Sequence, residues 1–340
     1  MPECSDNETS FSGNREKMSE HPLVTVVVVN FNGRHFLGEC LASLSNQNYT
    51  PIEIILVDNA SSDGSAEFVR ASFPGVHIVQ NSENRGFSGG ANSGIMESNG
   101  TYIMTLNNDT RMDSHCISYL VHAMASDARI GMGTIKMLFP DGTINSTGIC
   151  ISRSGAAWDR EMFKRDSPDN NFEEEIIGPC AGAAIYRRSM LDAIGLFDED
   201  FFLFMEDVDL ALRARLAGWE CVYVPQAVVY HHHGGTAGFM SDLTVYYGNR
   251  NILWYPVKDF PAWYLVTSLP WIVGRTIAVI PYYALRGQGG VILKSKIDGL
   301  KGIPGMIRKR RSVERIINPG MIKKLIRTWS SIQRRSDVDH

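Results

Sequence analysis

An apolar segment at residues 100–106 ends abruptly in three polar residues, Asn107, Asn108 and Asp109. A short apolar run of this kind is typical of a buried strand. In an open α/β sheet, ligands bind in the crevice beyond the carboxyl ends of the strands, so these acceptor-rich side chains are predicted to face whatever the domain binds. An ordinary turn is the alternative, because Asn and Asp are favoured in turns without any ligand.

A glycine-rich segment at residues 84–92 gives the same edge the means to hold a nucleotide. Glycines let the backbone approach a ligand closely, and the free N–H groups of a helix N-terminus attract an anion. No GxGxxG follows the first predicted strand, where residues 30–33 read Asn-Phe-Asn-Gly, and no Walker GxxxxGK[ST] occurs. The site is therefore neither of the two commonest phosphate-binding loops.

Three acids, Glu206, Asp207 and Asp209, lie in the first turn of a helix that is predicted to end at Gly218. Residues two apart on a helix point about 200° apart, so Asp207 and Asp209 are predicted to face opposite sides. Asp209 can pair with Arg213 four residues later, which is a structural role. Acids in a first helical turn also complement the helix dipole, and this is the alternative to a chemical role.

The elements that must position these residues alternate between strand and helix. A β-branched run at 23–29 is typical of a strand buried on both faces, and a second strand, turn and helix repeat the pattern. This order predicts a parallel sheet with right-handed crossovers. An acidic segment at 159–175 is predicted to be a surface loop. The predicted strands lie at 23–29, 52–57, 76–79, 100–106, 130–137 and 222–230, and the small residues at 178–186 lead into another. The predicted helices lie at 36–44, 66–69, 117–125 and 206–216, and one more opens at the glycine-rich segment 84–92.

Composition is that of an ordinary globular protein, with 44% hydrophobic and 21% charged residues in a chain of 340. A formal net charge of -4 argues against nucleic-acid binding, which needs a basic surface. Six scattered cysteines without a CxxC pair indicate neither a zinc ribbon nor a disulfide framework, which favours a reduced, cytosolic setting. Residues 1–21 are polar and lack the apolar core of a signal peptide, so we expect a disordered lead-in.

The segment 262–283 is apolar, rich in Trp and Tyr, and approaches the length of a membrane span. Pro270, Gly274 and Arg275 interrupt its middle, and a basic segment follows from residue 308. This pattern predicts a helix pair that lies in the headgroup region of a membrane. A helical cap on the preceding domain, or the surface of a homo-oligomer, is the alternative.

Six motifs follow one another along the chain, and each is weak singly. They are Val-Val-Asn-Phe-Asn-Gly at 28–33, Val-Asp-Asn-Ala-Ser-Ser-Asp-Gly at 57–64, Asn-Arg-Gly-Phe-Ser-Gly-Gly-Ala-Asn at 84–92, Leu-Asn-Asn-Asp at 106–109, Phe-Met-Glu-Asp-Val-Asp-Leu-Ala-Leu-Arg at 204–213, and the histidines at 231–233. Together they resemble the family 2 glycosyltransferases, in particular the bacterial rhamnosyltransferase-like and galactofuranosyltransferase-like branch. The resemblance implies an inverting nucleotide-sugar enzyme of the GT-A fold, an α/β fold with a mostly parallel, Rossmann-like sheet flanked by helices, here with a C-terminal helical appendage.

The resemblance assigns four residues to the nucleotide. Asn30 and Asp58 match the family's base-binding positions, where a carboxylate at the end of the second strand can accept the N3–H of uracil or thymine. Arg85 and Gly86 resemble the segment that lines the nucleotide, and Arg85 would reach a phosphate.

The resemblance also implies a metal site. Asn107, Asn108 and Asp109 occupy the place of the family's DXD motif, and Asp109 matches its final acid. Many members have Asp where this chain has Asn107, and an amide oxygen can ligate Mg²⁺ or Mn²⁺ but brings no charge, so weaker metal affinity is expected. His231 resembles the histidine that completes the metal site in this branch. Three histidines in a solvated loop are the alternative.

Asp207 occupies the place of the family's catalytic base. Glu206 is predicted to bind acceptor hydroxyls, with a cap on the helix as the alternative. An acceptor hydroxyl is a poor nucleophile until a base takes its proton as the bond to the anomeric carbon forms. A divalent metal neutralises the charge that the leaving diphosphate gains. With base and metal on opposite sides of the sugar, direct displacement with inversion is implied.

We therefore predict a lead-in at 1–21, a GT-A domain at 22–254, and a helical, apolar and then basic region at 255–340. The predicted enzyme transfers a sugar, with rhamnose as a candidate, from a UDP- or dTDP-sugar to a saccharide or polyprenyl-linked acceptor in cell-surface polysaccharide synthesis, at the cytoplasmic face of the membrane. A non-catalytic sugar- or nucleotide-binding scaffold on the same fold is the rival hypothesis, which Glu206 and Asp207 disfavour. A processive membrane synthase is a third, but the chain lacks the QxxRW motif.

Overall fold

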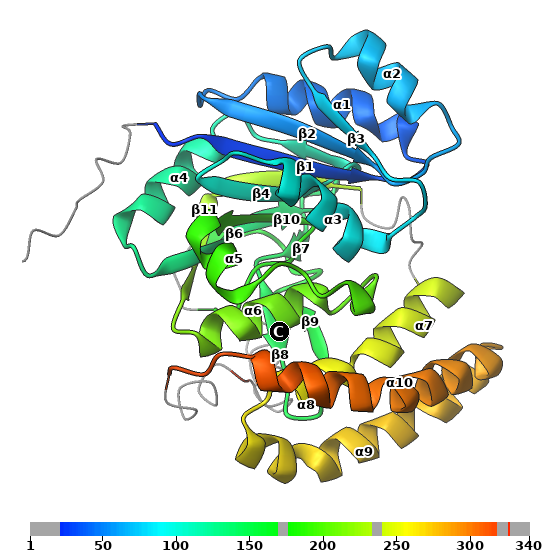
Figure 1. Cartoon of the computed structure of the whole chain (residues 1–340). Coiled ribbons are helices and arrows are strands. Elements are labelled where there is room, and N and C mark those ends of the chain that lie inside the picture. The colour runs from blue at the N-terminus through cyan, green and yellow to red at the C-terminus, as the bar shows by residue number, and fades with distance from the viewer. Residues whose placement is uncertain (1–20, 169–175, 233–239, 318–325, 327–340) are drawn as a thin grey trace, which may run out of the picture.

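The computed structural model describes residues 21–168, 176–232, 240–317 and 326, and its centre is a sheet with helices on both faces (Figure 1). Within these residues nine strands form that sheet, and two more form a separate hairpin. The strands run across the sheet in the order β3 (His77–Gln80), β2 (Ile52–Asp58), β1 (Val24–Asn30), β4 (Tyr102–Asn107), β10 (Ala183–Arg187), β6 (Ile130–Leu138), β11 (Glu220–His231) and β5 (Thr110–Met112), with β7 (Ile144–Ser146) paired to β6.

The sheet is parallel on one side and mixed on the other. β1 pairs in parallel with β2 and β4, so their carboxyl ends meet at one edge, where Asn30 lies beside Asp58 and Val29 beside Asn107. β10 runs antiparallel between β4 and β6, and β5 runs antiparallel to β11. The predicted α/β sheet is confirmed, although β5, β7 and β10 make it more mixed than the sequence pattern indicated.

Both faces of β1 are buried, as its run of valines predicts. Val26 and Val28 belong to the apolar cluster that includes Leu41 of the first helix, whereas Val27 belongs to the cluster on the other face with Ile95. Each such side chain contributes about 1.5–3 kcal/mol to folding when it is fully buried. The helices are α1 (Arg34–Ser45), α2 (Ser65–Ser72) and α4 (Cys116–Ser126) on the first face, and α3 (Gly86–Glu97), α5 (Arg188–Ile194) and α6 (Glu206–Leu216) on the second.

Four helices follow β11 and lie below the sheet in the view of Figure 1. They are α7 (Asp242–Asn251), α8 (Trp254–Asp259), α9 (Ala262–Ala284) and α10 (Gly289–Lys309). α10 packs along α7, α8 and α9, and α8 packs on α6. The helical C-terminal region is thus confirmed for its described part. Residues 1–20 of the lead-in predicted at 1–21, and residues 318–340 of the basic tail apart from Ile326, lie outside the described residues.

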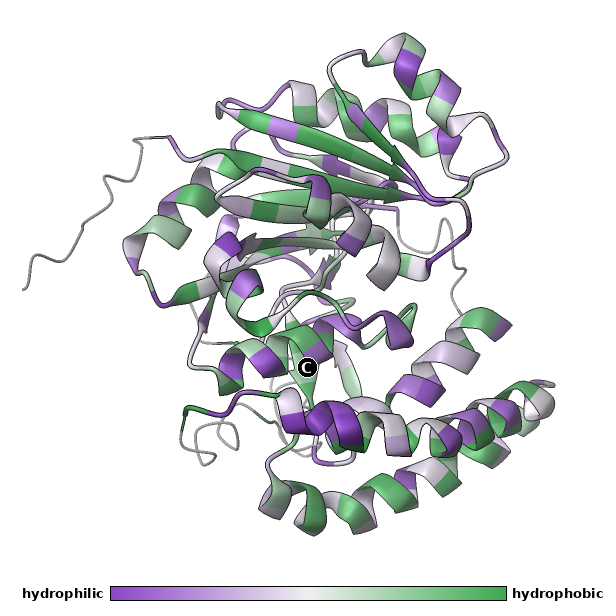
Figure 2. Ribbon diagram, viewed as in Figure 1, coloured by the Kyte–Doolittle hydropathy of each residue, from purple (hydrophilic) through white to green (hydrophobic). Residues whose placement is uncertain are grey.

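The predicted interruption of the apolar segment is wrong. α9 continues through Pro270 and Pro281 as one helix of 23 residues, because a proline removes a single backbone hydrogen bond while the turns on either side keep theirs. The segment 262–283 is therefore one helix and not a pair, and the helix that packs along it is α10. α9 is apolar along most of its length (Figure 2), and by length and composition it could cross a bilayer.

A short hairpin, β8 (Ile149–Ile151) and β9 (Ala157–Asp159), stands apart from the main sheet. Its last residue, Asp159, lines the central cavity, and the next residue, Arg160, is only 5% exposed. The start of the segment 159–175 is therefore not the surface loop that its acidic composition predicted. Residues 169–175 of that segment lie outside the described residues. Two short 3₁₀ turns complete the chain, η2 (Glu199–Phe201) and η3 (Arg310–Ser312).

Candidate active site

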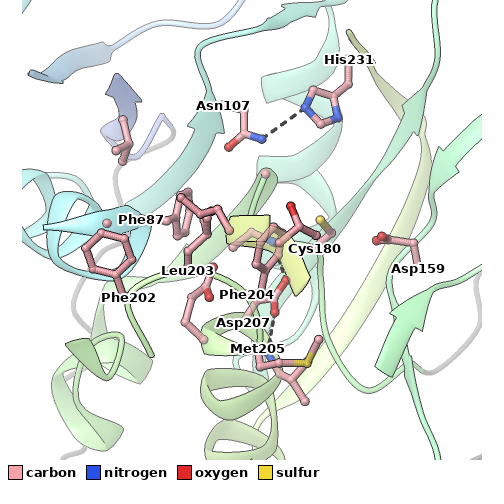
Figure 3. Close-up of a pocket in the computed structure, with 18 of the residues that line it drawn as sticks. Phe87, Asn107, Asp159, Cys180, Phe202, Leu203, Phe204, Met205, Asp207 and His231 are labelled. Carbon is pink, nitrogen blue, oxygen red and sulfur yellow. Dashed lines mark hydrogen bonds between the residues drawn. The ribbon is translucent and has the colours of Figure 1, made fainter. Parts of the chain in front are cut away.

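A cavity of about 410 Å³ opens beyond the carboxyl ends of β1, β4 and β11. Asn107 and His231 lie on one side of it and Asp207 on the other, as Figure 3 shows. Asn107 precedes Asp207 and His231 by 100 positions or more, and the strand ends and the start of α6 bring all three to one place. The cavity also has an apolar wall of aromatic and aliphatic side chains, including Phe87, Phe202 and Leu203.

His231 is the last residue of β11, and it contacts the polar end of β4. Its Nε2 lies 3.1 Å from Asp109 Oδ1 and 3.2 Å from the amide nitrogen of Asn107. Its Nδ1 lies 2.8 Å from Asn145 Oδ1. An amide oxygen can only accept a hydrogen bond, so Nδ1 carries the ring proton and donates a hydrogen bond to it. The neighbouring His232 instead faces Glu39, with Nε2 3.6 Å from Oε2. His233 lies outside the described residues.

This arrangement fits a divalent cation. With the proton on Nδ1, the lone pair of His231 Nε2 faces the Asp109 carboxylate, and two such acceptors repel unless a cation or a second proton lies between them. Asn107 presents its amide nitrogen to Nε2 at 3.2 Å, so its oxygen would face an ion only after the amide group turns over. No three His, Cys, Asp or Glu side chains gather as a metal site anywhere in the described residues, so the protein itself supplies few metal ligands. Such a set suits Mg²⁺ or Mn²⁺, which bind one or two carboxylates and complete their shell with phosphate oxygens.

The predicted nucleotide residues lie along the neighbouring strand ends. Asn30 is fully buried, donates to Ser61 Oγ at 3.1 Å and accepts from Asn108 Nδ2 at 2.6 Å. Asp58 is 3% exposed and accepts from the backbone N–H of Ser61 at 3.3 Å. Both side chains are therefore held at the edge where a base would bind, while Asn108 also lines the cavity.

Arg85 and Gly86 begin the glycine-rich helix α3. The Arg85 guanidinium forms an ion pair with Glu199 at 2.7 Å and donates to Ser93, so in this structure it is engaged away from the cavity. Gly86 does line the cavity, with φ at 67°, and a Cβ there would meet the carbonyl oxygen of Phe202 at 2.2 Å. This contact requires glycine and joins the glycine-rich segment to the loop before α6.

Asp207 is held at the start of α6 by two backbone N–H groups. Its Oδ1 accepts from Val208 at 2.8 Å, and its Oδ2 accepts from Ala181 at 3.3 Å. Burial, and next the negative charge of Asp159, raise the pKa of Asp207 to about 6. A carboxyl group with this pKa is ionised at neutral pH yet is basic enough to accept a proton, which suits a general base.

Glu206 precedes it and is 5% exposed. Its Oε2 has no hydrogen-bond partner in the described part of the chain, and burial together with the charge of Asp207 raises its pKa well above the usual range. A buried oxygen without a partner is unfavourable by itself, because its hydration is lost and nothing replaces it. Glu206 therefore offers an acceptor oxygen, or a proton, to a molecule in the cavity.

The segment 180–182 connects the two sides of the cavity. The carbonyl oxygen of Gly182 accepts from the backbone N–H of Asn107 at 2.8 Å, while Ala181 donates to Asp207. The hydroxyl of Thr105 donates to the carbonyl oxygen of Ala181 at 2.7 Å. One short, small-residue segment therefore fixes the spacing between the end of β4 and the start of α6.

The loop before α6 has an unusual backbone. Phe202, Phe204 and Met205 all have positive φ angles, of 65°, 67° and 69°. For residues other than glycine such conformations cost about 1–3 kcal/mol each, and they persist where the surrounding structure imposes them. The same loop supplies much of the apolar wall of the cavity.

Two residues at the end of α7 impose that conformation. Asn251, which is fully buried, donates from Nδ2 to the carbonyl oxygens of Phe201, Leu203 and Phe204 at 2.9, 2.9 and 2.7 Å. Arg250 donates to the carbonyl oxygen of Phe201 at 2.9 Å. The C-terminal helices thus hold the loop that leads into Asp207.

Several cavity residues were not predicted from the sequence. Asn145 is in β7 and fixes the His231 ring, and Trp158 and Asp159 are in β9 and line the cavity. Strands of three residues show no periodic pattern, so the sequence carried no signal for β7 or β9. Asp159 was hidden by the acids that follow it, which indicated a solvated loop.

The chain has recognisable relatives. The model of the family described as "Glycosyl transferase family 2" matches residues 25–195, half of the chain. The N-acetylglucosaminyl-diphospho-decaprenol L-rhamnosyltransferase of Mycobacterium tuberculosis is 28% identical over 239 residues, which are 64% of this chain and 78% of that protein. The O-antigen biosynthesis protein RfbC of Myxococcus xanthus is 25% identical over 221 residues, 62% of this chain and 17% of that protein.

Solved structures share the fold. The mannosyltransferase PcManGT from Pyrobaculum calidifontis, in complex with GDP-Man and Mn2+, superimposes with a TM-score of 0.53 at 17% identity, over 86% of this chain and 85% of that one. Residues 1–349 of TarS from S. aureus, in complex with UDP, superimpose with a TM-score of 0.52 at 14% identity, over 86% of this chain and 93% of that one. At these identities the likeness concerns the fold.

Proposed function

This chain belongs to glycosyl transferase family 2 and is a glycosyltransferase, and from that premise we propose that it transfers a sugar from a UDP- or dTDP-sugar to a lipid-linked or growing saccharide, with inversion. The observation that carries the proposal is Asp207, a carboxylate with a raised pKa that lies across the cavity from the Asp109–His231 pair. The names of the relatives support rhamnose as the sugar and cell-surface polysaccharide assembly as the process.

Asp207 is the proposed general base. It takes the proton of the acceptor hydroxyl as the hydroxyl oxygen bonds to the anomeric carbon. Hydrogen bonds from the backbone N–H groups of Ala181 and Val208 keep its carboxylate pointed across the cavity. Glu206 is proposed to bind acceptor hydroxyls beside it. Because the acceptor oxygen attacks from the α6 side and the diphosphate leaves on the β4 side, the displacement is direct and inverts the anomeric carbon.

The other side of the cavity is proposed to bind the diphosphate with a divalent cation. Asp109, His231 and Asn107 would hold the ion, and Asn145 keeps the His231 lone pair turned toward it. When bound, Mg²⁺ or Mn²⁺ neutralises the charge that develops on the leaving diphosphate. Asn30, Asp58, Gly86 and Asn108 are proposed to bind the nucleotide, and Arg85 would reach a phosphate after leaving Glu199.

A thermal-shift panel of nucleotide sugars tests this assignment. The preferred donor should raise the melting temperature in the presence of Mn²⁺, by the equivalent of about 2.7 kcal/mol when the donor is at 100 times its Kd. Asp109→Ala and His231→Asn should lose the Mn²⁺-dependent part of the shift. His232→Asn is the matched control, because His232 faces Glu39 outside this set, and it should keep the full shift. Wild-type activity that EDTA leaves undiminished would overturn the metal assignment.

We also propose that α9 and α10 hold the enzyme on the cytoplasmic surface of an anionic membrane, and that residues 22–254 form the catalytic domain. Most of the large apolar side chains that are exposed in the described residues lie on these two helices, including Trp271 at 59% and Ile277 at 63%. On α10, Leu293, Ile297 and Leu300 form an exposed stripe at helical spacing beside the buried residues of that helix. Basic residues follow at 308–311 and favour anionic lipid.

Sedimentation with anionic liposomes tests the membrane proposal. The protein should bind and be released by high salt or carbonate, since charge attraction is screened by salt. The double variant Trp271→Asp with Ile277→Asp should lose binding, whereas Met96→Asp, at a 63% exposed apolar residue of α3, should not. Retention after carbonate would instead indicate that α9 spans the bilayer, and equal binding by both variants would contradict the proposal.

A further inference from the structure

The hairpin β8–β9 carries two residues into the cavity that no part of the mechanism above uses. Trp158 and Asp159 both line the cavity, on the wall next to Asp207. Figure 3 shows the Asp159 carboxylate pointing from β9 into the space below Asn107 and His231. The hairpin pairs only with itself among the described strands, so the main sheet does not require a carboxylate at this position.

The surroundings of Asp159 differ from those of a structural acid. Its Oδ1 is buried and has no hydrogen-bond partner in the described part of the chain, and the charge of His231 offsets the burial of the carboxylate only in part. Ser146 and Cys180 donate to the carboxylate, while Asp207 is a second negative charge nearby. Folding gains little from a carboxylate in this environment, because desolvation and repulsion both oppose its charge.

Its neighbour in the sequence shows the contrast. Arg160 is turned away from the cavity, where its Nε donates to Thr147 Oγ1 at 3.0 Å and its guanidinium lies over the ring of Tyr223. The polar contacts that secure the end of β9 are therefore made by Arg160. Asp159 is left to face the cavity with an acceptor oxygen available.

We propose that Trp158 and Asp159 form a subsite for a saccharide. The Asp159 carboxylate accepts hydrogen bonds from hydroxyls of one sugar ring, and the indole of Trp158 packs on the face of that sugar ring that presents C–H groups. An ionised carboxylate only accepts, and a pair of neighbouring hydroxyls presents two donors to its two oxygens. An aromatic ring supplies a flat apolar surface with little conformational freedom to lose. This subsite rests on the proposed function, since it needs a sugar in the cavity.

Both the donor sugar and the acceptor present such hydroxyls. The other end of the hairpin lies against the C-terminal helices, where Arg153 donates to the carbonyl oxygen of Thr267 in α9 and Gly155 lies close to Pro256 of α8. An acceptor that arrives on a lipid would come from the side of α9. We therefore expect the acceptor to be the sugar bound here.

The test combines three measurements on Asp159→Asn: affinity for UDP and dTDP with Mn²⁺, hydrolysis of the donor by water, and the kinetics of transfer. Loss of charge-assisted hydrogen bonds should raise the KM for one sugar substrate at least about tenfold, with nucleoside diphosphate affinity unchanged. A raised acceptor KM with normal donor hydrolysis identifies the acceptor, and a raised donor KM identifies the donor sugar. Asp192→Asn, at an exposed acid of α5, is the control that should change nothing.

Trp158→Leu is the second variant, and it replaces Asp159→Asn if that protein does not fold. It should likewise raise the KM for one sugar substrate. Unchanged KM values for both sugars, or weaker binding of UDP and dTDP themselves, would overturn the subsite while leaving the glycosyltransferase assignment intact. Wild-type protein that binds no nucleotide sugar at all would overturn the proposed function, and the subsite with it.

Discussion

The two sides of helix α6 carry the same kind of residue in opposite surroundings. Asp209, on the side of the core, is fully buried and lies 2.9 Å from Arg213 Nε and 2.5 Å from Lys258 Nζ. Asp207, on the side of the cavity, has no cation beside it in the described residues, and its charged neighbour is another acid, Asp159. The two residues are two positions apart, one on each side of Val208.

The difference separates stability from function. Ion pairs at Asp209 join α6 to α8, because Lys258 also contacts Asp198 at 2.6 Å. Carboxylates gathered without counter-ions, like Asp207 with Asp159 and Glu206, weaken the folded state, and their raised pKa values mark a candidate reaction site. The predicted pairing of Asp209 with Arg213 is confirmed.

The sharpest test of this comparison is Asp207→Asn, which keeps the shape of the side chain and removes its basicity. We expect turnover to fall by about 10²–10⁴-fold, the usual contribution of a general base. Donor affinity should change little, because only transition-state stabilisation is lost. The melting temperature should not fall, since a carboxylate with a raised pKa opposes folding when ionised. If Glu206→Gln abolished turnover while Asp207→Asn did not, the base would be misassigned by one residue.

Asp209→Asn makes the same chemical change on the opposite side of the helix. It leaves Lys258 and Arg213 buried with one carboxylate fewer, and breaking a buried ion pair costs on the order of 3–5 kcal/mol. We expect a lower melting temperature, measured by calorimetry, with turnover largely kept at temperatures where the variant is folded. A folded Asp209→Asn enzyme without turnover would break the separation of the two sides.

Asn251→Leu tests whether the strained loop positions the start of α6. The carbonyl oxygens of Phe201, Leu203 and Phe204 would lose their donor, so we expect turnover to fall by roughly tenfold while UDP affinity is kept. Asn249→Leu is the matched control, since Asn249 is a buried amide of the same helix that bonds to Val245 and Lys296 instead. Equal losses of turnover in both variants would assign only a stabilising role to Asn251.

The pH profile gives the smallest and most specific effect. Because the pKa of Asp207 is raised from 3.8 to about 6, turnover should decline about tenfold per pH unit below 6, as the base becomes protonated. The proton favours the folded state, so this contribution to stability is present below pH 4 and is lost as the pH rises through 6. Asp159→Asn removes one of the two acids that face Asp207, with Glu206 remaining, and should move the decline to lower pH. If turnover of Asp159→Asn declined at the same pH as that of the wild type, Asp159 would not raise the pKa of Asp207.

Much of the cavity side formed by the strand ends was predictable from the sequence. Apolar strands that stop at polar residues place those residues at one edge, because parallel strands share the direction of their carboxyl ends, and Asn30, Asp58 and Asp109 follow this rule. The helical repeat predicts that Asp207 and Asp209 diverge, and the ion pairs of Asp209 agree. Both results depend on local geometry that a continuous stretch of chain imposes on itself.

The sequence by itself therefore determined the α/β fold, the family, and which strand ends and which helix start meet at the cavity. Only the tertiary structure decided that His231 rather than His232 meets Asp109, that Asn145 and Asp159 enter the cavity, and that Asn251 holds a loop about 50 residues earlier in the chain. The physical reason is that these contacts join segments that are distant in the chain and too short to have a periodic pattern. Their positions depend on how helices and hairpins pack around the sheet, which no local rule specifies.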